Sequence, residues 1–187
     1  MEDIRKALLE VYAGRADKRY GLSDVTQLQH ALQAANLAEA AGEPPSLIVA
    51  SLLHDLGHMI HQLGTDTLER GINDAHEETG AQWLARWFGA DVSEPVRLHV
   101  AAKRYLCSVE GHYDRLARDS RRSLELQGGM MTEAEIAGFR AEPYADDAVR
   151  VRRFDDMAKT PTAQTPPFEH FLDRYVIPLV RSPEVAR

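Results

Sequence analysis

The feature of this sequence that most constrains its fold is the adjacent pair His54-Asp55, which is accompanied by three further histidines at nearly even intervals. His30 precedes His54 by 24 residues, His76 follows it by 22, and His99 follows His76 by 23. A lone histidine on a helix is usually an ordinary surface or core residue. Four of them, each in its own predicted helix and each flanked by apolar residues, favour a fold in which several helices direct imidazoles to one place.

The pattern of apolar residues predicts an all-α protein. Apolar side chains recur at helical spacing through most of the chain, and residues 45–58 are mostly apolar, as in a helix that its neighbours bury on nearly all sides. The sequence has no sustained alternation of apolar and polar residues and no Asn-Gly or Asp-Gly hairpin. We expect helices over residues 3–13, 25–41, 45–58, 74–88, 92–109, 146–159 and 168–180, with shorter helical stretches between 119 and 137.

The segments between these helices also carry readable signals. Residues 15–24 are polar and predict a loop, at the end of which Ser23 or Asp24 could cap the next helix. Residues 59–73 follow no regular pattern and predict a turn and an excursion over the site. Thr132 is followed three residues later by a glutamate, which is the pattern of a capping box at a helix start.

Composition limits the setting in which the protein works. A chain of 187 residues without internal repeats or a linker fits one domain, which we expect to span residues 1–187. With a single cysteine, Cys107, no long apolar run and no targeting segment at its start, the chain is expected to be cytoplasmic. The net charge of −7 disfavours nucleic acid or an anionic membrane as a partner. A small molecule is the expected partner.

Histidine and carboxylate side chains together are typical ligands of first-row transition metals such as iron, manganese, zinc and cobalt. A carboxylate beside a ligand histidine can bridge two ions, so Asp55 is the candidate for a shared ligand. Late in the chain, Asp155 and Asp156 are both available. If apolar residues at 151, 154 and 158 form the buried stripe of their helix, Asp155 lies at its margin and Asp156 on the far side. The expected two-metal site consists of His30, His54, Asp55, His76, His99 and Asp155.

Basic side chains near these positions indicate an anionic substrate. Lys103 lies one helical turn after His99, and Arg152 lies nearly one turn before Asp155. Because arginine binds phosphate-like groups in a bidentate manner, we expect a phosphate or phosphonate. The alternative is that both cations are surface charges or partners of the metal ligands.

Further polar residues are weaker candidates for the same site. Ser123 and Gln127, four residues apart, could add hydrogen bonds to the anion. His58 follows His54 by about one turn and is either a hydrogen-bond partner of the substrate or an ordinary histidine. The remaining histidines lack such support and are expected to be structural or solvent-exposed; these are His61, His112 and His170.

Taken together, the motifs resemble those of the HD-domain superfamily. Local sequences narrow the resemblance to the mixed-valence diiron oxygenases of phosphonate breakdown, which are relatives of myo-inositol oxygenase. The likeness covers about residues 12 to 160. It is carried by the metal pattern above and by Tyr20-Gly21, residues 25–35, 53–58, 99–106, 123–129 and 151–156.

The resemblance implies an HD-domain helical bundle around two iron ions in the Fe2+/Fe3+ mixed-valence state. One iron would be held by His30, His54, Asp55 and Asp155, and the other by Asp55, His76 and His99. Tyr20 would belong to a segment that occupies the second iron until substrate arrives. The residues around the substrate would be His58, Lys103, Ser123, Gln127 and either Arg152 or Arg153, with Asp55, His58 and Lys103 as the catalytic residues.

The implied reaction is the O2-dependent cleavage of the C–P bond of a 1-hydroxyphosphonate, which releases phosphate and a carboxylate. The glycine-forming member of this family acts on 2-amino-1-hydroxyethylphosphonate and carries a glutamate at the place of Ser23. This chain has Asp24 one position later. Because a shifted and shorter acid leaves more room at the cationic end of the substrate, we expect the trimethylammonio compound, with glycine betaine as product, ahead of the primary amine.

Two other functions use the same side chains. An HD-type metal phosphohydrolase would act on a nucleotide or small phosphate ester, with redox-inert ions and a water nucleophile. His58, Lys103 and the Gly128-Gly129 pair favour the oxygenase over this alternative. A non-catalytic HD protein is the third possibility, and the intact set of six ligands disfavours it.

Overall fold

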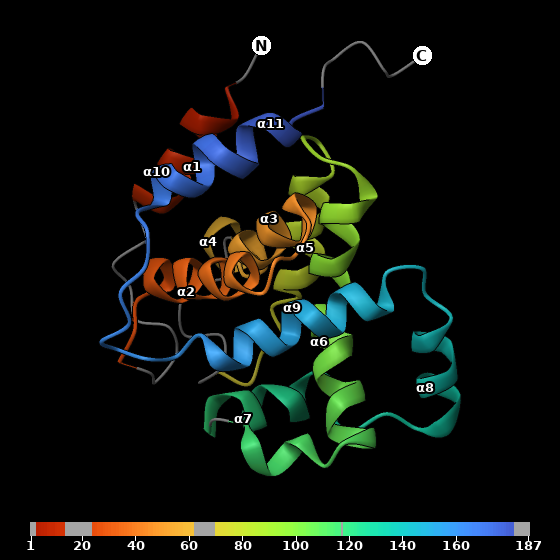
Figure 1. The fold of residues 1–187 in the computed structure, drawn as a ribbon. Coiled ribbons are helices and arrows are strands. Elements are labelled where there is room, and N and C mark those ends of the chain that lie inside the picture. The colour runs from red at the N-terminus through yellow and green to blue at the C-terminus, as the bar shows by residue number, and fades with distance from the viewer. Residues whose placement is uncertain (1–2, 14–23, 62–69, 117, 182–187) are drawn as a thin grey trace.

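The computed structural model describes residues 3–13, 24–61, 70–116 and 118–181, and in this part of the chain the regular elements are helices (Figure 1). The all-α prediction is confirmed. The elements are α1 (Ile4–Ala13), α2 (Gln27–Ala40), α3 (Pro45–Leu53), α4 (Gly57–Ile60), α5 (His76–Leu84), α6 (Ala90–Val109), η1 (His112–Arg115), α7 (Arg118–Leu126), α8 (Glu133–Arg140), α9 (Ala145–Met157), α10 (Phe168–Phe171), η2 (Leu172–Val176) and α11 (Ile177–Leu179).

Helix α3 lies in the core of the molecule, with α2, α6 and α9 packed around it (Figure 1). Every residue from Leu47 to Leu53 is buried, as the apolar character of this segment predicted. Pro45 occupies the first turn, where its missing N–H costs no helical hydrogen bond. Because α3 is covered on all sides, its C-terminal end is a rigid base for the residues that follow.

The expected helix over 45–58 is in fact interrupted. Helix α3 ends at Leu53, and the next residues form a turn closed by hydrogen bonds between residues three apart, Leu56 N to Leu53 O and His58 N to Asp55 O. The imidazole of His54 contributes to the break because its Nδ1 donates to the carbonyl oxygen of Ser51, 2.9 Å away. His54 and Asp55 therefore lie in a turn and not in a continuous helix.

The start of α2 differs from the expected cap. Thr26, and neither Ser23 nor Asp24, is the N-cap residue. Its hydroxyl accepts from the backbone N–H of Gln29 at 3.1 Å, while the Gln29 side chain accepts from the Thr26 N–H at 2.9 Å. This capping box satisfies two otherwise unpaired donors at once. Asp24 is exposed before the helix, and Ser23 lies outside the described residues.

Other helices also begin or end at residues that differ from those predicted. The helix expected over 74–88 begins at His76, after Ala75 in a left-handed conformation with φ of 47°. The helix expected over 168–180 is divided into α10, the π-helical η2 and α11. The capping box at Thr132 is confirmed at the start of α8.

The first and last described helices pack together at one end of the molecule (Figure 1). Arg5 of α1 forms an ion pair with Asp173. The rings of Tyr12 and Phe168 lie with their centroids 4.8 Å apart. Both segments close the core on the side of α3 and α4 that is remote from α7.

No helix in the described ranges combines the length and the apolar character needed to cross a membrane.

Candidate metal centre

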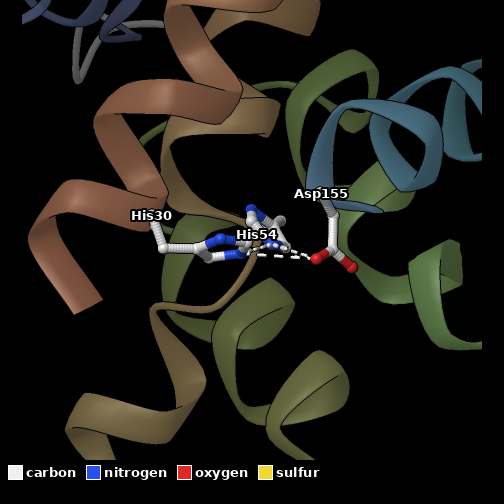
Figure 2. Close-up of side chains that lie close together, drawn as sticks. All are labelled: His30, His54 and Asp155. Atoms are coloured by element: carbon white, nitrogen blue, oxygen red, sulfur yellow. Dashed lines mark hydrogen bonds and ion pairs between the residues drawn. The ribbon is translucent and has the colours of Figure 1, made fainter. Parts of the chain in front are cut away.

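Three buried side chains from helices far apart in the sequence meet in the core. His30 comes from α2, His54 from the C-terminal end of α3, and Asp155 from α9 (Figure 2). The two Nε2 atoms are 3.2 Å apart, and Asp155 Oδ1 lies 3.4 Å from that of His30 and 4.0 Å from that of His54. All three side chains are almost wholly inaccessible to solvent. Their donor atoms are close enough to share one metal ion.

A second group is joined to the first by Asp55. His76, the first residue of α5, and His99 of α6 have Nε2 atoms 3.2 Å apart, each 3.5 Å from Asp55 Oδ1. The other carboxylate oxygen, Oδ2, lies 3.6 Å from His30 Nε2 and 3.4 Å from His54 Nε2. Asp55 therefore presents one oxygen to each pair of imidazoles, the geometry of a bridging ligand.

The tautomers of these imidazoles follow from their second nitrogen. Nδ1 of His30 lies 2.8 Å from the carbonyl oxygen of Ala158, that of His54 2.9 Å from Ser51 O, and that of His99 2.7 Å from Val96 O. Nδ1 of His76 lies 2.9 Å from a carboxylate oxygen of Asp74. Because these oxygens can only accept, each Nδ1 carries a proton, which leaves Nε2, the nitrogen that faces Asp55, as the atom available to bind a metal ion.

This arrangement fits two metal ions. Unprotonated nitrogens 3.2 Å apart repel each other unless a cation lies between them, and Asp55 Oδ2 is a buried oxygen that has no hydrogen-bond partner in the described part of the chain. Burial lowers the pKa of His54 to about 4 and that of His76 to about 3, which keeps both rings in the neutral form that binds metal.

The two late carboxylates have different surroundings. Asp155 faces His30 and His54, whereas Asp156 accepts from His112 Nε2 at 2.7 Å and from Arg152. Burial would raise the pKa of Asp155, but Arg152 and Lys159, together with His30 and His54, outweigh that effect and lower it. Only Asp155 of this pair joins the converging nitrogens among the described residues.

Buried cations border the same cluster. Arg152, 3% exposed, forms ion pairs with both Asp155 and Asp156. Lys159 Nζ lies 3.3 Å from Asp155 Oδ1, a contact that was not predicted although the two residues are four apart in the chain. Arg153, the alternative to Arg152, is instead at the surface, where it pairs with Glu110.

Lys103 of α6 is buried, with only 3% of its surface exposed to solvent. Its Nζ donates to Ser123 Oγ at 2.9 Å, so these two candidates are together. Burial, assisted by the charge of Arg152, lowers the Lys103 pKa to about 7. An anion beside Lys103 would favour the charged ammonium.

The other sequence candidates have varied positions. The His58 ring stacks on that of His76 with centroids 3.7 Å apart, and its Nε2 is 3.9 Å from Asp55 Oδ1. Gln127 is half-buried on the segment after α7; its N–H donates to Ser123 O at 2.9 Å, and its side chain has no hydrogen bond to the cluster among the described residues. Asp24 is exposed. Tyr20 lies outside the described residues.

Asp74 is the main site residue that sequence reasoning missed. Its carboxylate accepts from Nδ1 of His58 at 2.7 Å, from Nε2 of His61 at 3.1 Å and from Nδ1 of His76 at 2.9 Å. Burial would raise its pKa, but the hydrogen bonds from His58 and His76 and the charges of these two rings outweigh that effect and lower it. The position of Asp74 two residues before His76 was the available signal.

The expectation for the remaining histidines was too general. His61 and His112 are buried, and each is bonded to an acid at the edge of the cluster, Asp74 and Asp156 respectively. His170 is half-buried and lies 3.0 Å from Glu39, away from the cluster. His61 and His112 are thus structural partners of site residues.

Comparison with known proteins agrees with this geometry. The HD domain model matches residues 28–157. The chain is 48% identical to a hydroxymethylphosphonate dioxygenase of Gimesia maris over 149 residues, 79% of this chain and 74% of the relative. It is 39% identical to a [1-hydroxy-2-(trimethylamino)ethyl]phosphonate dioxygenase (glycine-betaine-forming) of Leisingera caerulea over 162 residues, 86% of this chain and 83% of the relative. The match covers most of the chain, and histidines and aspartates converge in its helical bundle as described above. The chain belongs to the HD-domain family.

Proposed function

We propose that this protein uses O2 to cleave the C–P bond of a 1-hydroxyphosphonate and that it does so with two iron ions in the Fe2+/Fe3+ mixed-valence state. The observation that carries the proposal is the convergence of four Nε2 atoms in two pairs on the two oxygens of Asp55. Two relatives that cover most of the chain are named as phosphonate dioxygenases, which supports oxygen chemistry at this site over hydrolysis.

The ligand sets follow from the contacts. His30, His54 and Asp155 would hold one ion, His76 and His99 the other, and Asp55 would bridge them. When bound, such an iron pair supplies the redox chemistry with O2. The protein's own task is then to bind the substrate, to orient it and to keep bulk water away.

Charge around the ligands suits a phosphonate group. Lys103, Arg152 and Lys159 are cations that are buried or largely buried, and a dianion placed among them would be neutralised at short range. His58 has Nε2 on the side of Asp55 and would meet the substrate next to the bridging carboxylate. The hydroxyl of Ser123 accepts a hydrogen bond from Lys103 Nζ at 2.9 Å and so helps to position this cation.

The overall reaction balances without another reductant. A substrate R–CH(OH)–PO3(2−) and O2 give R–COO(−), HPO4(2−) and one proton: the C–P bond breaks, and C1 and phosphorus each gain a bond to oxygen. The electrons that reduce O2 come from C1 and from the C–P bond. One O2 is therefore consumed for each phosphate released.

The identity of the group R can be tested with the two compounds that the relatives' names give. One relative acts on hydroxymethylphosphonate, in which R is hydrogen, and the other on the trimethylamino compound that gives glycine betaine. Purified iron-loaded enzyme should be assayed with both and with 2-amino-1-hydroxyethylphosphonate. The sequence expectation favours the trimethylamino compound, and a higher kcat/KM for either of the others would replace it.

The decisive test of the reaction is the dependence on oxygen. Aerobic assays should release one phosphate per O2 consumed, and anaerobic assays should release none. Retention of phosphate release without O2 would exclude an oxygenase and favour the phosphohydrolase. In the iron-loaded protein, an electron paramagnetic resonance signal of a mixed-valence pair that changes when the phosphonate is added is expected, and two ions of iron per chain should be bound.

A further inference from the structure

One carboxylate links the candidate metal ligands to the residue expected to face the substrate. Asp74 Oδ1 accepts from His76 Nδ1 at 2.9 Å, and Asp74 Oδ2 accepts from His58 Nδ1 at 2.7 Å. The two rings are stacked with centroids 3.7 Å apart and planes 20° from parallel. Both rings bind the Asp74 carboxylate through Nδ1, so both direct Nε2 toward Asp55. The Nε2 atom of His76 lies 3.5 Å from Asp55 Oδ1, and that of His58 lies 3.9 Å from it.

The backbone holds Asp74 in this position. Ala75 has φ of 47° and ψ of 39°, a left-handed conformation that costs an L-residue about 1 kcal/mol. The N–H of Ala75 donates to the side chain of Asn73 at 3.3 Å, and the N–H of His76 points to Asp74 Oδ1 at 3.4 Å. This turn folds the Asp74 carboxylate back over the first residue of α5, and the strain indicates that its placement matters.

Asp74 is also distinguished from the other acid beside His76. Glu77 Oε2 lies 3.5 Å from His76 Nδ1, beyond the 2.9 Å of Asp74 Oδ1, and it has no hydrogen-bond partner among the described residues. Glu77 follows His76 in α5, whereas Asp74 precedes it. The two acids therefore share a neighbourhood but only one binds the ring, which makes Glu77 a matched control.

We infer that Asp74 is a positioning residue that holds His58 and His76 as a parallel pair, so that one ring presents Nε2 to the second metal ion and the other presents Nε2 to the substrate. This role deepens the proposed function and rests on it. In this role Asp74 is not itself a ligand of the metal or the substrate and acts through the two rings. A carboxylate that fixes a ligand imidazole typically changes metal affinity about 10- to 100-fold when removed.

The variant Asp74→Asn tests this role because the amide keeps the shape but has a single accepting oxygen, which can replace Oδ2 at His58 and His61 or Oδ1 at His76 but not both. The oxygen is expected to face His58 and His61, where it accepts from two rings. His76 must then lose its bond or move its proton from Nδ1 to Nε2, the atom that faces Asp55. In anaerobic Fe2+ titrations, the variant should bind the second ion about 10- to 100-fold more weakly than wild type, with the first ion unchanged. The kcat should fall at least tenfold at saturating iron, while KM changes less because Lys103 and Arg152 are untouched.

Two further measurements keep the inference open to refutation. Glu77→Gln should retain wild-type iron affinity and kcat, and an equal loss in both variants would overturn the assignment to Asp74. Nitrogen-15 spectra of Zn2+-loaded wild-type protein, with histidine signals assigned by substitution, should show a proton on Nδ1 of both His58 and His76. A missing Nδ1 proton on either ring would refute the inference even if Asp74→Asn does not fold.

Failure of the proposed function would look different. If wild-type protein binds two ions but releases phosphate without O2, the oxygenase proposal fails, and the iron titration and tautomers still decide the role of Asp74. If wild-type protein turns over a 1-hydroxyphosphonate and Asp74→Asn matches it in second-site affinity, kcat and tautomers, the role of Asp74 is wrong and the proposed function stands.

Discussion

At the scale of single residues, the buried lysine beside the cluster is the most consequential charge. Lys103 is 3% exposed, and its Nζ contacts the hydroxyl of Ser123. Burying an ammonium is unfavourable unless an anion compensates for it, which is also why its pKa is lowered to about 7. A bound phosphonate would therefore offset the unfavourable free energy of burying the Lys103 ammonium.

Replacing Lys103 with methionine should therefore weaken turnover without weakening the fold. Loss of one charge-assisted hydrogen bond to the phosphonate, about 1.5–3 kcal/mol, corresponds to a decrease in kcat/KM of roughly 10- to 100-fold. Steady-state kinetics would measure this, and thermal unfolding of Lys103→Met should show equal or greater stability than wild type. An unchanged kcat/KM would remove Lys103 from the substrate site.

The adjacent carboxylates of α9 provide a matched pair of substitutions. Asp155→Ala removes an oxygen 3.4 Å from His30 Nε2, whereas Asp156→Ala removes the partner of His112 and Arg152. We expect Asp155→Ala to lose about one of two bound iron ions per chain and Asp156→Ala to keep both. Metal analysis by mass spectrometry decides, and normal iron in Asp155→Ala would reject it as a ligand.

Sequence periodicity favoured Asp155 over Asp156 because helix geometry places neighbours on different faces, and in the structure Asp155 is the more deeply buried of the two. Periodicity could not identify Asp74 or His112, because each acts through a partner that lies far away in the sequence. Residue types and their spacing indicate possible ligands. Only packing reveals which groups orient those ligands.

At the scale of elements, the site depends on a close approach between α4 and α5. A Cβ atom added to Gly57 would lie 1.9 Å from the carbonyl oxygen of His76, so the two backbones touch at this point. Gly80, one turn into α5, faces Gly57 from the other side with its hypothetical Cβ 3.2 Å from Gly57 N. The contact fixes the distance between the turn that carries Asp55 and the helix that begins with His76.

Gly57→Ala should consequently damage both the fold and the centre. Overpacking of this kind costs about 1–3 kcal/mol of unfolding free energy or more, since a backbone atom must move. Gly138→Ala in α8 is the control, because its added Cβ meets nothing within 4 Å and should stabilise the helix by about 0.5–1 kcal/mol. Urea unfolding of both variants checks the contrast, and comparable stabilities would contradict it.

Most helices could be predicted from the sequence, whereas several of their ends could not. The stretch at 45–58 is mostly apolar, and its pattern did not indicate that the helix stops at Leu53. The helix ends there because the His54 side chain donates a hydrogen bond to the carbonyl oxygen of Ser51 and because Gly57 packs closely against α5. Long-range contacts of this type override local propensity.

At the scale of the whole molecule, a polar contact ties the last described segment to α2. Glu39 accepts from the hydroxyl of Tyr175 at 2.6 Å and lies 3.0 Å from His170 Nε2. Burial would raise the Glu39 pKa, but the hydrogen bonds from Tyr175 and His170 outweigh it and lower the pKa below 4.5. The contact joins the C-terminal region to the same helix that carries His30.

Glu39→Gln should lower stability by about 1 kcal/mol at neutral pH and leave iron binding intact, because no metal candidate contacts this residue. A carboxylate with a depressed pKa stabilises the fold above its unfolded-state pKa and loses this effect as pH falls through the folded value. The difference between wild type and variant should thus be largest at pH 7 and shrink below about pH 4.5. Urea unfolding at several pH values measures it, and a difference that grows toward acid pH would refute the argument.

The way the four imidazoles are oriented has a consequence for how such a centre can be altered. His30, His54 and His99 are held through Nδ1 by main-chain carbonyls, which no side-chain replacement can remove. His76 alone among them relies on a side chain, Asp74. A substitution at Asp74 can therefore change the binding of the ion held by His76 while the imidazoles of the other ion keep their orientation. Among related chains, differences in metal preference are expected mainly at the site that contains His76.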